Sequence, residues 1–131
     1  MTKTEHYDLP QWEPTDRVLR EDFNEAMEKL ETALTSKIGI IFGSYTGNDV
    51  NGRTINLGFT PVAVYLCEQG GLAGVVPGST YCYGGLMTPE LPIKLSNQTA
   101  AEIVENGFKV YDDVYIRTNV RSTVYYYIAF R

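Results

Sequence analysis

The chain has 131 residues, of which 44% are hydrophobic, and a formal net charge of −5. This length suits one ordinary domain with a small appended element, and the apolar content is sufficient for a hydrophobic core. The acidic balance and the scattered basic residues argue against binding along a nucleic-acid backbone, which requires clustered Lys and Arg. No apolar run near the N-terminus or elsewhere is long enough for a signal peptide or a membrane span, so we expect folding in a cytoplasm.

The N-terminal part is predicted to be an extended arm followed by one helix. Residues 1–14 contain two prolines on either side of a tryptophan, and a residue before proline disfavours helical geometry. The helix is predicted over about 16–35, where helix formers are frequent and neither Gly nor Pro occurs. Thr15 or Asp16 is the expected N-cap.

An apolar stripe runs along this predicted helix. Five of its residues are spaced four, three, four and three positions apart, as in a heptad seam. They are Leu19, Phe23, Ala26, Leu30 and Ala33, and Met27 and Leu34 widen the stripe on one side. The stripe packs either on the protein's own sheet or against further copies of the helix, and two heptads leave both alternatives open.

The segment GNDVNGRT (residues 47–54) matches the phosphate-binding pattern G-x-x-x-x-G-K-[ST], except that Arg53 replaces the lysine. Such a loop requires a helix directly after it. Here the following INLGFTPVAVYL alternates like a strand and contains Gly58 and Pro61. The segment is therefore predicted to connect two antiparallel strands, and not to bind a nucleotide.

From Lys37 onward the apolar pattern alternates and predicts short strands separated by Gly, Pro and Asn turns. The predicted strands cover residues 38–43, 54–57, 62–67, 72–76, 81–83, 101–104, 108–111, 114–117 and 124–131. In the last of these, the even-numbered residues point to one face and the odd-numbered residues to the other. The predicted fold class is mainly β, an antiparallel β-sandwich preceded by one N-terminal α-helix.

No arrangement of residues predicts catalysis, a cofactor or a metal. The single histidine, His6, lies in the predicted arm, and Cys67 and Cys82 do not complete a zinc-ligand cluster with it. Asp112 and Asp113 are neighbours whose side chains face opposite sides of a strand, so they do not converge as an acid and base. We expect a non-enzyme with both cysteines reduced.

Tyrosine is over-represented, with ten copies, several of them beside loops rich in Gly, Ser, Asn and Asp. Tyrosine offers contact area at low entropic cost, and sugar rings stack on aromatic faces while their hydroxyls bind Asp, Asn and Arg. The candidate ligand-binding residues are Tyr81, Tyr83, Asp112, Asp113, Tyr115 and Arg117. The alternative, that tyrosines are ordinary sandwich residues, stays open for those in loops and is expected for residues 125–127.

Three segments together resemble the small tail-fibre or receptor-binding proteins encoded by bacteriophages and prophages of Gram-positive bacteria. They are YDLPQWEPTDRVLREDFNEAMEKLETAL, GSYTGNDVNGRTINLGFTPVAVYL and GFKVYDDVYIRTNVRSTVYYYIAFR, in the expected order. The resemblance rests on GxYTGN...GRTIxLGFTP and YYYIAF as a set.

The resemblance implies a protein of the virion tail, made in the bacterial host cytoplasm and presented as a homotrimer. It implies an arm and an oligomerisation or attachment helix over 1–36, which contacts other phage tail proteins. It also implies, over 37–131, a receptor-binding β-sandwich similar to H-type lectin and fibre-tip folds, whose ligand is a bacterial cell-surface polysaccharide. The motif residues Thr54, Ile55, Leu57, Phe59, Tyr126, Ile128 and Phe130 would be scaffold.

Two other functions are weighed against this one. The first is a baseplate or fibre assembly protein that binds other tail proteins through its arm and helix without any glycan. The second is an enzyme that trims surface polysaccharide, which needs a pair of carboxylates. Candidates are Glu68, Glu90 and Asp113, but nothing in their spacing joins them.

Overall fold

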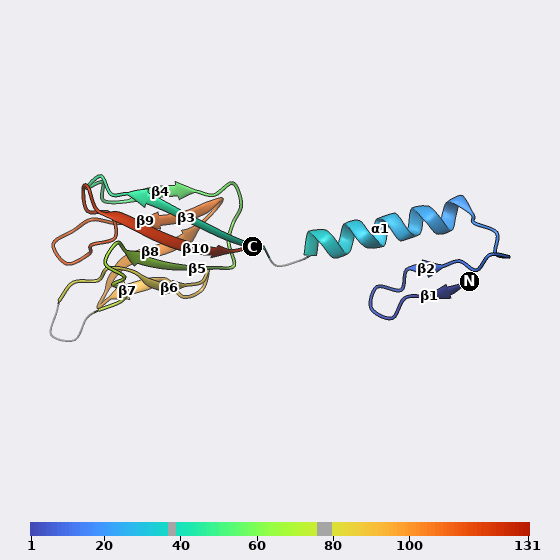
Figure 1. Ribbon diagram of the computed structural model, residues 1–131. Helices are drawn as coiled ribbons and strands as arrows, with labels where there is room; N and C mark the ends of the chain where they lie inside the picture. Colours follow the sequence, from blue (N-terminus) through green and yellow to red (C-terminus); the bar gives the residue numbers. More distant parts are fainter. Residues whose placement is uncertain (37–38, 76–79) are drawn as a thin grey trace. The chain divides into compact units, whose positions relative to one another are not determined.

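The computed structural model describes residues 1–36, 39–75 and 80–131. The chain divides into two compact units, Met1–Ile38 and Gly39–Arg131, close to the boundary expected after residue 36 (Figure 1). The fold is mainly β, with antiparallel sheets and one helix among the described residues, which confirms the predicted fold class.

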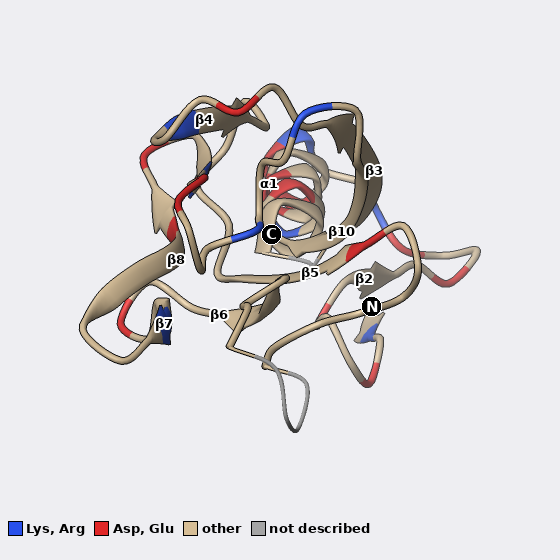
Figure 2. Ribbon diagram, turned by 90° about the vertical axis from the view of Figure 1, so that its left-hand side faces the viewer, with Lys and Arg blue, Asp and Glu red and all other residues tan. Residues whose placement is uncertain are grey.

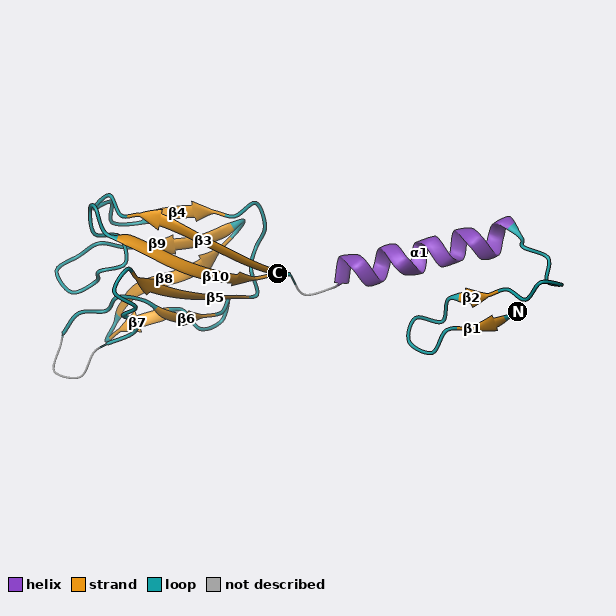
Figure 3. Cartoon of the chain, viewed as in Figure 1, coloured by secondary structure: helices purple, strands orange, loops and turns teal. Residues whose placement is uncertain are grey.

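The second unit is a sandwich of two four-stranded antiparallel sheets (Figure 3). The first, here called the β10 sheet, has the order β3 (Ile40–Thr46), β10 (Val124–Phe130), β5 (Ala63–Glu68) and β6 (Gly85–Met87). The second, the β8 sheet, has the order β4 (Arg53–Asn56), β9 (Gly107–Val110), β8 (Gln98–Val104) and β7 (Ile93–Leu95).

The hydrophobic core lies between the two sheets, because alternate residues of each strand point inward. The aromatic side chains at its centre pack in pairs. The rings of Tyr45 and Tyr125 stack with centroids 5.1 Å apart, and Phe108 meets Tyr127 edge-on at the same separation. Burying an aromatic residue of this size is worth several kcal/mol, so these pairs contribute strongly to the stability of the sandwich.

The predicted alternation of the last strand is confirmed, but its even-numbered face is not in the core. Tyr125 and Ala129 are buried and Tyr127 packs against the core, whereas Tyr126 is exposed on the outer side of the sheet. Ile128 and Phe130, expected as scaffold, share this outer face and are only half-buried. Among the other expected scaffold residues, Ile55 is buried, Leu57 and Phe59 pack against the core, and Thr54 is exposed.

The GNDVNGRT segment connects the two sheets, so the expectation that it joins two paired strands is wrong. β3 pairs with β10, and β4 pairs with β9. The chain crosses between the layers at Gly47, where an added Cβ would lie 1.9 Å from the Val120 carbonyl oxygen. Only glycine allows the backbone of the 119–123 segment to pass this close.

Three further predicted strands are not strands in the structure. Residues 72–75, 81–83 and 114–117 contribute only isolated bridges, which join Val75 to Cys82, Cys82 to Ile116 and Asp112 to Arg117. Val76, at the end of the first of these predicted strands, lies outside the described residues. In contrast, β6 and β7 were not predicted, because each has only three residues and too few positions to show an alternation.

The first unit is a small β-hairpin beside the helix. The hairpin strands are β1 (Thr2–Lys3) and β2 (Pro10–Gln11), so the predicted extended arm is wrong. Helix α1 spans Arg20–Ser36 and begins later than predicted. Asp16 does not cap it, because its carboxylate accepts a hydrogen bond from the Glu13 N–H at 2.7 Å and pairs with the Met1 amino group at 2.8 Å.

The predicted helix seam is only partly covered within this unit. Ala26 is buried, and Leu30 and Ala33 are half-buried, whereas Leu19 and Phe23 remain exposed. The exposed and half-buried apolar residues form a continuous helix stripe, spaced four, four, three and four positions apart. The helix stripe consists of Leu19, Phe23, Met27, Leu30 and Leu34.

Ion pairs hold the hairpin of the first unit to its helix. Lys29 Nζ lies 3.0 Å from Asp8 Oδ2, and this hydrogen bond lowers the pKa of Asp8 from 3.8 and raises the pKa of Lys29 from 10.5. A hydrogen bond from the Met1 amino group likewise lowers the pKa of Asp16. The two aspartates therefore stabilise the unit above pH 3.8 and lose this effect as the pH falls further, whereas the Lys29 contribution is lost above pH 10.5.

We expect the first unit to loosen as the pH falls below 3.8 while the sandwich keeps its strands, because the sandwich core is apolar. Trp12, the single tryptophan, is half-buried next to β2, so its fluorescence reports on this unit alone. Its emission should shift to longer wavelength in acid, with a smaller shift in Asp8→Asn. A constant emission across the titration would contradict the assigned role of the ion pairs.

Candidate functional site

Two segments of the sandwich unit lie side by side and carry four of the six predicted ligand-binding residues. The Cys82 N–H donates to the Tyr115 carbonyl at 2.9 Å, and the Arg117 N–H donates to the Cys82 carbonyl at 2.8 Å. Cys82 and Ile116 are buried at the centre of these segments. Since neighbouring residues of an extended chain point to opposite sides, the flanking side chains face outward together. This set, here called the aromatic cluster, consists of Tyr81, Tyr83, Tyr115 and Arg117.

The members of the aromatic cluster contact one another through their rings. The centroid of Tyr81 lies 6.3 Å from that of Tyr83 and 6.4 Å from that of Tyr115. The guanidinium carbon of Arg117 lies 4.8 Å from the Tyr81 ring centroid, which is a cation–π distance. The cluster thus combines aromatic faces, hydroxyl groups and one positive charge on a single surface.

A shallow depression of about 240 Å³ opens beside this cluster. It is lined by Glu68, Tyr81, Tyr83, Arg117, Val120, Thr123 and Tyr125. Sequence reasoning did not predict Glu68 or Tyr125 as part of the site. Glu68 ends β5, and the inward face of β10 brings Tyr125 to the same end of the sandwich, so only the pairing of these strands places them here.

Tyr125 and Tyr45 position the segment that carries Arg117. The Tyr125 hydroxyl donates to the Arg117 carbonyl at 2.6 Å and accepts from the Val120 N–H at 3.1 Å. The Tyr45 hydroxyl donates to the Thr118 carbonyl at 2.6 Å. Burial raises the pKa of Tyr125 to about 12 and also raises the pKa of Tyr45, so both hydroxyls stay protonated as donors at neutral pH.

Two fully buried polar residues of the same segment hold it in place through hydrogen bonds. Thr118 Oγ1 donates to the Ala100 carbonyl at 2.7 Å and accepts from the Tyr111 N–H at 2.9 Å. Asn119 Nδ2 donates to Asn48 Oδ1 at 2.7 Å. Because buried polar groups are costly unless they are hydrogen-bonded, these bonds allow only one path for the chain through residues 117–120.

Arg53, at the lysine position of the phosphate-like pattern, is used within this network. Its Nη1 donates to the Thr46 carbonyl at 2.7 Å and to Asn119 Oδ1 at 3.2 Å, and its guanidinium carbon lies 5.5 Å from the Tyr45 ring centroid. β4 begins at Arg53, so the segment lacks the following helix that a phosphate-binding loop requires. The arrangement is therefore structural.

Asp112 and Asp113 lie in the loop before Arg117 and are not among the residues that line the depression. Asp113 Oδ2 accepts a hydrogen bond from Gln98 at 3.0 Å. Burial raises the pKa of Asp112, with a smaller contribution from the negative charge of Asp49. The structure therefore groups four of the predicted ligand-binding residues and places these two on the supporting loop.

The chemistry of the described residues is otherwise limited. Both cysteines are free thiols, as expected, with Cys67 half-buried and Cys82 buried. Burial raises the pKa of the Cys82 thiol. Within residues 1–36, 39–75 and 80–131, no three His, Cys, Asp or Glu side chains come together as a metal site. In the same residues, no helix combines the length and the apolar character needed to cross a membrane.

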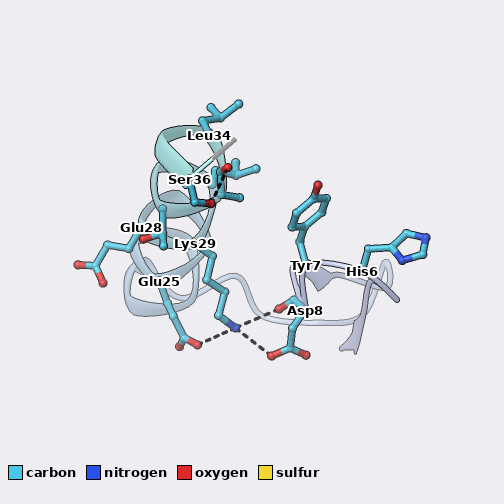
Figure 4. Close-up of a pocket in the computed structure, with 11 residues that line it drawn as sticks. His6, Tyr7, Asp8, Glu25, Glu28, Lys29, Leu34 and Ser36 are labelled. Atoms are coloured by element: carbon cyan, nitrogen blue, oxygen red, sulfur yellow. Dashed lines mark hydrogen bonds and ion pairs between the residues drawn. The ribbon is translucent and has the colours of Figure 1, made fainter. Parts of the chain in front are cut away.

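A second cavity lies within the first unit, between the hairpin and the helix (Figure 4). This groove measures about 1010 Å³ and is lined on the hairpin side by His6, Tyr7 and Asp8. On the helix side Leu30 and Leu34 of the helix stripe contribute to its wall. The groove is apolar at one end, and the Lys29 ion pairs lie at the other.

Comparisons with protein-family models, with curated proteins and with solved structures find no match to this chain.

Proposed function

We propose that this protein is a non-catalytic binding protein of a bacteriophage tail, a fibre tip that recognises a polysaccharide of the bacterial surface. The observation that carries the proposal is the aromatic cluster beside a shallow depression at one end of the sandwich. Tyrosine rings offer flat faces for sugar rings, and the hydroxyls, Arg117 and Glu68 offer hydrogen-bonding partners for sugar hydroxyls.

The size of the depression supports binding to part of a long chain. Its volume of about 240 Å³ is below the roughly 300–1,000 Å³ of pockets that enclose a small-molecule ligand. A shallow contact of this kind is weak by itself. In a homotrimer, which the family resemblance implies, several weak contacts to one cell surface combine into strong attachment.

The carboxylates near the depression support a non-catalytic role. Glycoside hydrolysis normally requires two carboxyl groups that flank the bond to be broken. Among the described residues that line the depression, Glu68 is the only one with a carboxyl group. Its Oε1 accepts a hydrogen bond from the Gly70 N–H and so holds the turn after β5.

A second function, an assembly protein of the baseplate or fibre, is favoured by a different observation. The helix stripe and the adjoining groove leave apolar surface of the first unit uncovered within that unit. Such a surface suits contacts with other tail proteins. Under this alternative the aromatic cluster has no ligand.

The experiment is binding of the labelled, intact protein to a panel of Gram-positive cells and to the polysaccharides extracted from their walls. Saturable binding that is lost in Tyr81→Ala/Tyr83→Ala is the expected result. Tyr7→Ala, which changes an exposed tyrosine of the first unit, is the matched control and should bind normally. Absence of binding across the panel, by protein shown to be folded, would reject the glycan function in favour of the assembly role.

A further inference from the structure

The outer face of the β10 sheet carries no charged side chain. Its outward residues are the even-numbered residues of β3 and β10, the odd-numbered residues of β5, and Leu86 of β6. None of them is Asp, Glu, Lys or Arg. In Figure 2, accordingly, β3, β6 and β10 carry neither of the two charge colours. This surface is here called the uncharged face.

Large apolar side chains form a continuous row across the uncharged face. The strand registers place Ile128 opposite both Phe42 and Tyr65, and Tyr65 opposite Leu86, so the row crosses all four strands. A second row, parallel to the first, joins Ile40, Phe130 and Ala63. Phe42 is 75% exposed and Leu86 64% exposed, so both ends of the first row project into solvent.

The other sheet shows that this composition is not a general property of the sandwich. On the outer face of the β8 sheet, Lys109 lies opposite both Thr54 and Glu102, and Lys94 lies opposite Thr99. Such alternation of apolar inward residues and polar outward residues is expected where a sheet faces water. The two outer faces of the sandwich therefore differ, and only the outer face of the β8 sheet has the polar composition expected of a surface in contact with water.

The exposed apolar area of the uncharged face reaches the size of a functional surface patch. With roughly 200 Å² for each whole aromatic residue, the exposed fractions of Phe42 (75%), Tyr65 (41%) and Tyr126 (52%) amount to about 300 Å². This area, from three residues, already reaches the lower end of the range for the largest apolar patch on a typical monomer, about 300–600 Å². The remaining apolar residues of the two rows extend it.

We infer that the uncharged face is a contact surface between copies of this chain. In a closed symmetric assembly, residues near the symmetry axis meet their own counterparts, so a charge there would face an identical charge. A face free of charge avoids this repulsion between subunits that each carry a net charge of −5. A different partner would have no such restriction and could use charged residues for recognition. This contact is independent of the aromatic cluster and of any glycan.

The reactivity of Cys67 reports whether this surface is covered. It lies on the uncharged face opposite Tyr126 and is half-buried in the single chain, whereas Cys82 is buried in the core. In the assembly, neighbouring copies cover Cys67. Its reaction with a thiol reagent should therefore be slow at high protein concentration and become faster on dilution.

The test compares Leu86→Lys with Leu91→Lys in the full chain. The two leucines are similarly exposed, at 64% and 69%, but Leu91 lies in the turn after β6 and outside the uncharged face. The substitutions change the net charge equally, and a lysine on the short edge strand β6 is compatible with folding. Phe42→Lys is the second variant on the face. Unchanged circular dichroism shows that each variant is folded.

We expect the native chain and Leu91→Lys to form the same oligomer by sedimentation equilibrium, with slow Cys67 labelling. In Leu86→Lys and Phe42→Lys, Cys67 should be labelled at least about tenfold faster than in the native chain. The oligomer of these two variants should also have a smaller mass, unless contacts between the helices hold the copies together. Labelling of native Cys67 that is independent of protein concentration, whether fast or slow, would overturn the inference. So would slow labelling that neither variant accelerates, because it would show that other copies do not cover this face.

Discussion

Replacement of Asn119 by alanine is expected to lower the free energy of unfolding of the sandwich by about 3 kcal/mol. The side chain is fully buried, and its amide connects three parts of the chain. Nδ2 donates to Asn48 Oδ1 and to the Val50 carbonyl, and Oδ1 accepts from Arg53. Removal of the amide leaves these partners without their bonds, and each unmade bond of a buried polar group costs about 1–3 kcal/mol.

The measurement is thermal and urea unfolding of the native protein and of Asn119→Ala, monitored by far-ultraviolet circular dichroism. A loss of this size corresponds to a fall in Tm of roughly 10–20 °C for a unit of this length. Asn48→Ala, at an exposed position, removes the hydrogen bonds that Asn48 Oδ1 accepts from Asn119 and from the Val50 N–H, and should cost less than about 1 kcal/mol. If the two variants were equally stable, the buried amide would not be what holds the 117–120 segment.

Replacement of Arg117 by alanine is expected to weaken binding to the wall polysaccharide at least about 30-fold. The guanidinium group lies over the Tyr81 ring and lines the depression, so its loss removes both a cation–π contact and hydrogen-bond donors for a sugar. Arg117→Lys should recover only part of the affinity, because an ammonium group cannot stack flat on the ring. The measurement is a binding isotherm of each variant with a wall polysaccharide to which the native protein binds.

Arg121→Ala is the matched control for this prediction. Arg121 is exposed and pairs with Asp49 at 3.0 Å, and its replacement removes the same charge outside the depression. It should bind polysaccharide like the native protein. An equal loss of affinity in the Arg121 and Arg117 variants would indicate a general effect of charge and would contradict a specific role for Arg117.

Short-range patterns in the sequence were sufficient to predict much of the sandwich. β10 has seven residues, so its alternation is unambiguous, and β5, with six residues, was predicted in the same way, whereas only residues 101–104 of β8 were predicted. The residue types of the aromatic cluster were also predictable, because tyrosines among Gly and Ser residues suggest a binding loop. Helix α1 was predicted, but its first residue was not. The Asp16 carboxylate, expected to cap the helix, instead binds the Glu13 N–H and the Met1 amino group.

The pairing of distant strands was not predictable from these patterns. The GNDVNGRT segment has the composition of a hairpin turn, but β3 pairs with β10, about eighty residues further along the chain. The composition of a turn constrains its local dihedral angles and not the sheet that receives the next strand. For the same reason Glu68 and Tyr125 were missed, because only the pairing of β5 with β10 brings them to the depression.

The sequence by itself determined which residues of β10 share a face, because alternation follows from the geometry of a single extended strand. Only the tertiary structure decided which face is inside. Tyr125, Tyr127 and Ala129 point into the core because the β8 sheet covers that side, and Tyr126, Ile128 and Phe130 lie on the outer side of the sandwich unit. Both faces of β10 are apolar, so the face that is buried depends on what packs against the strand. The local sequence does not determine this.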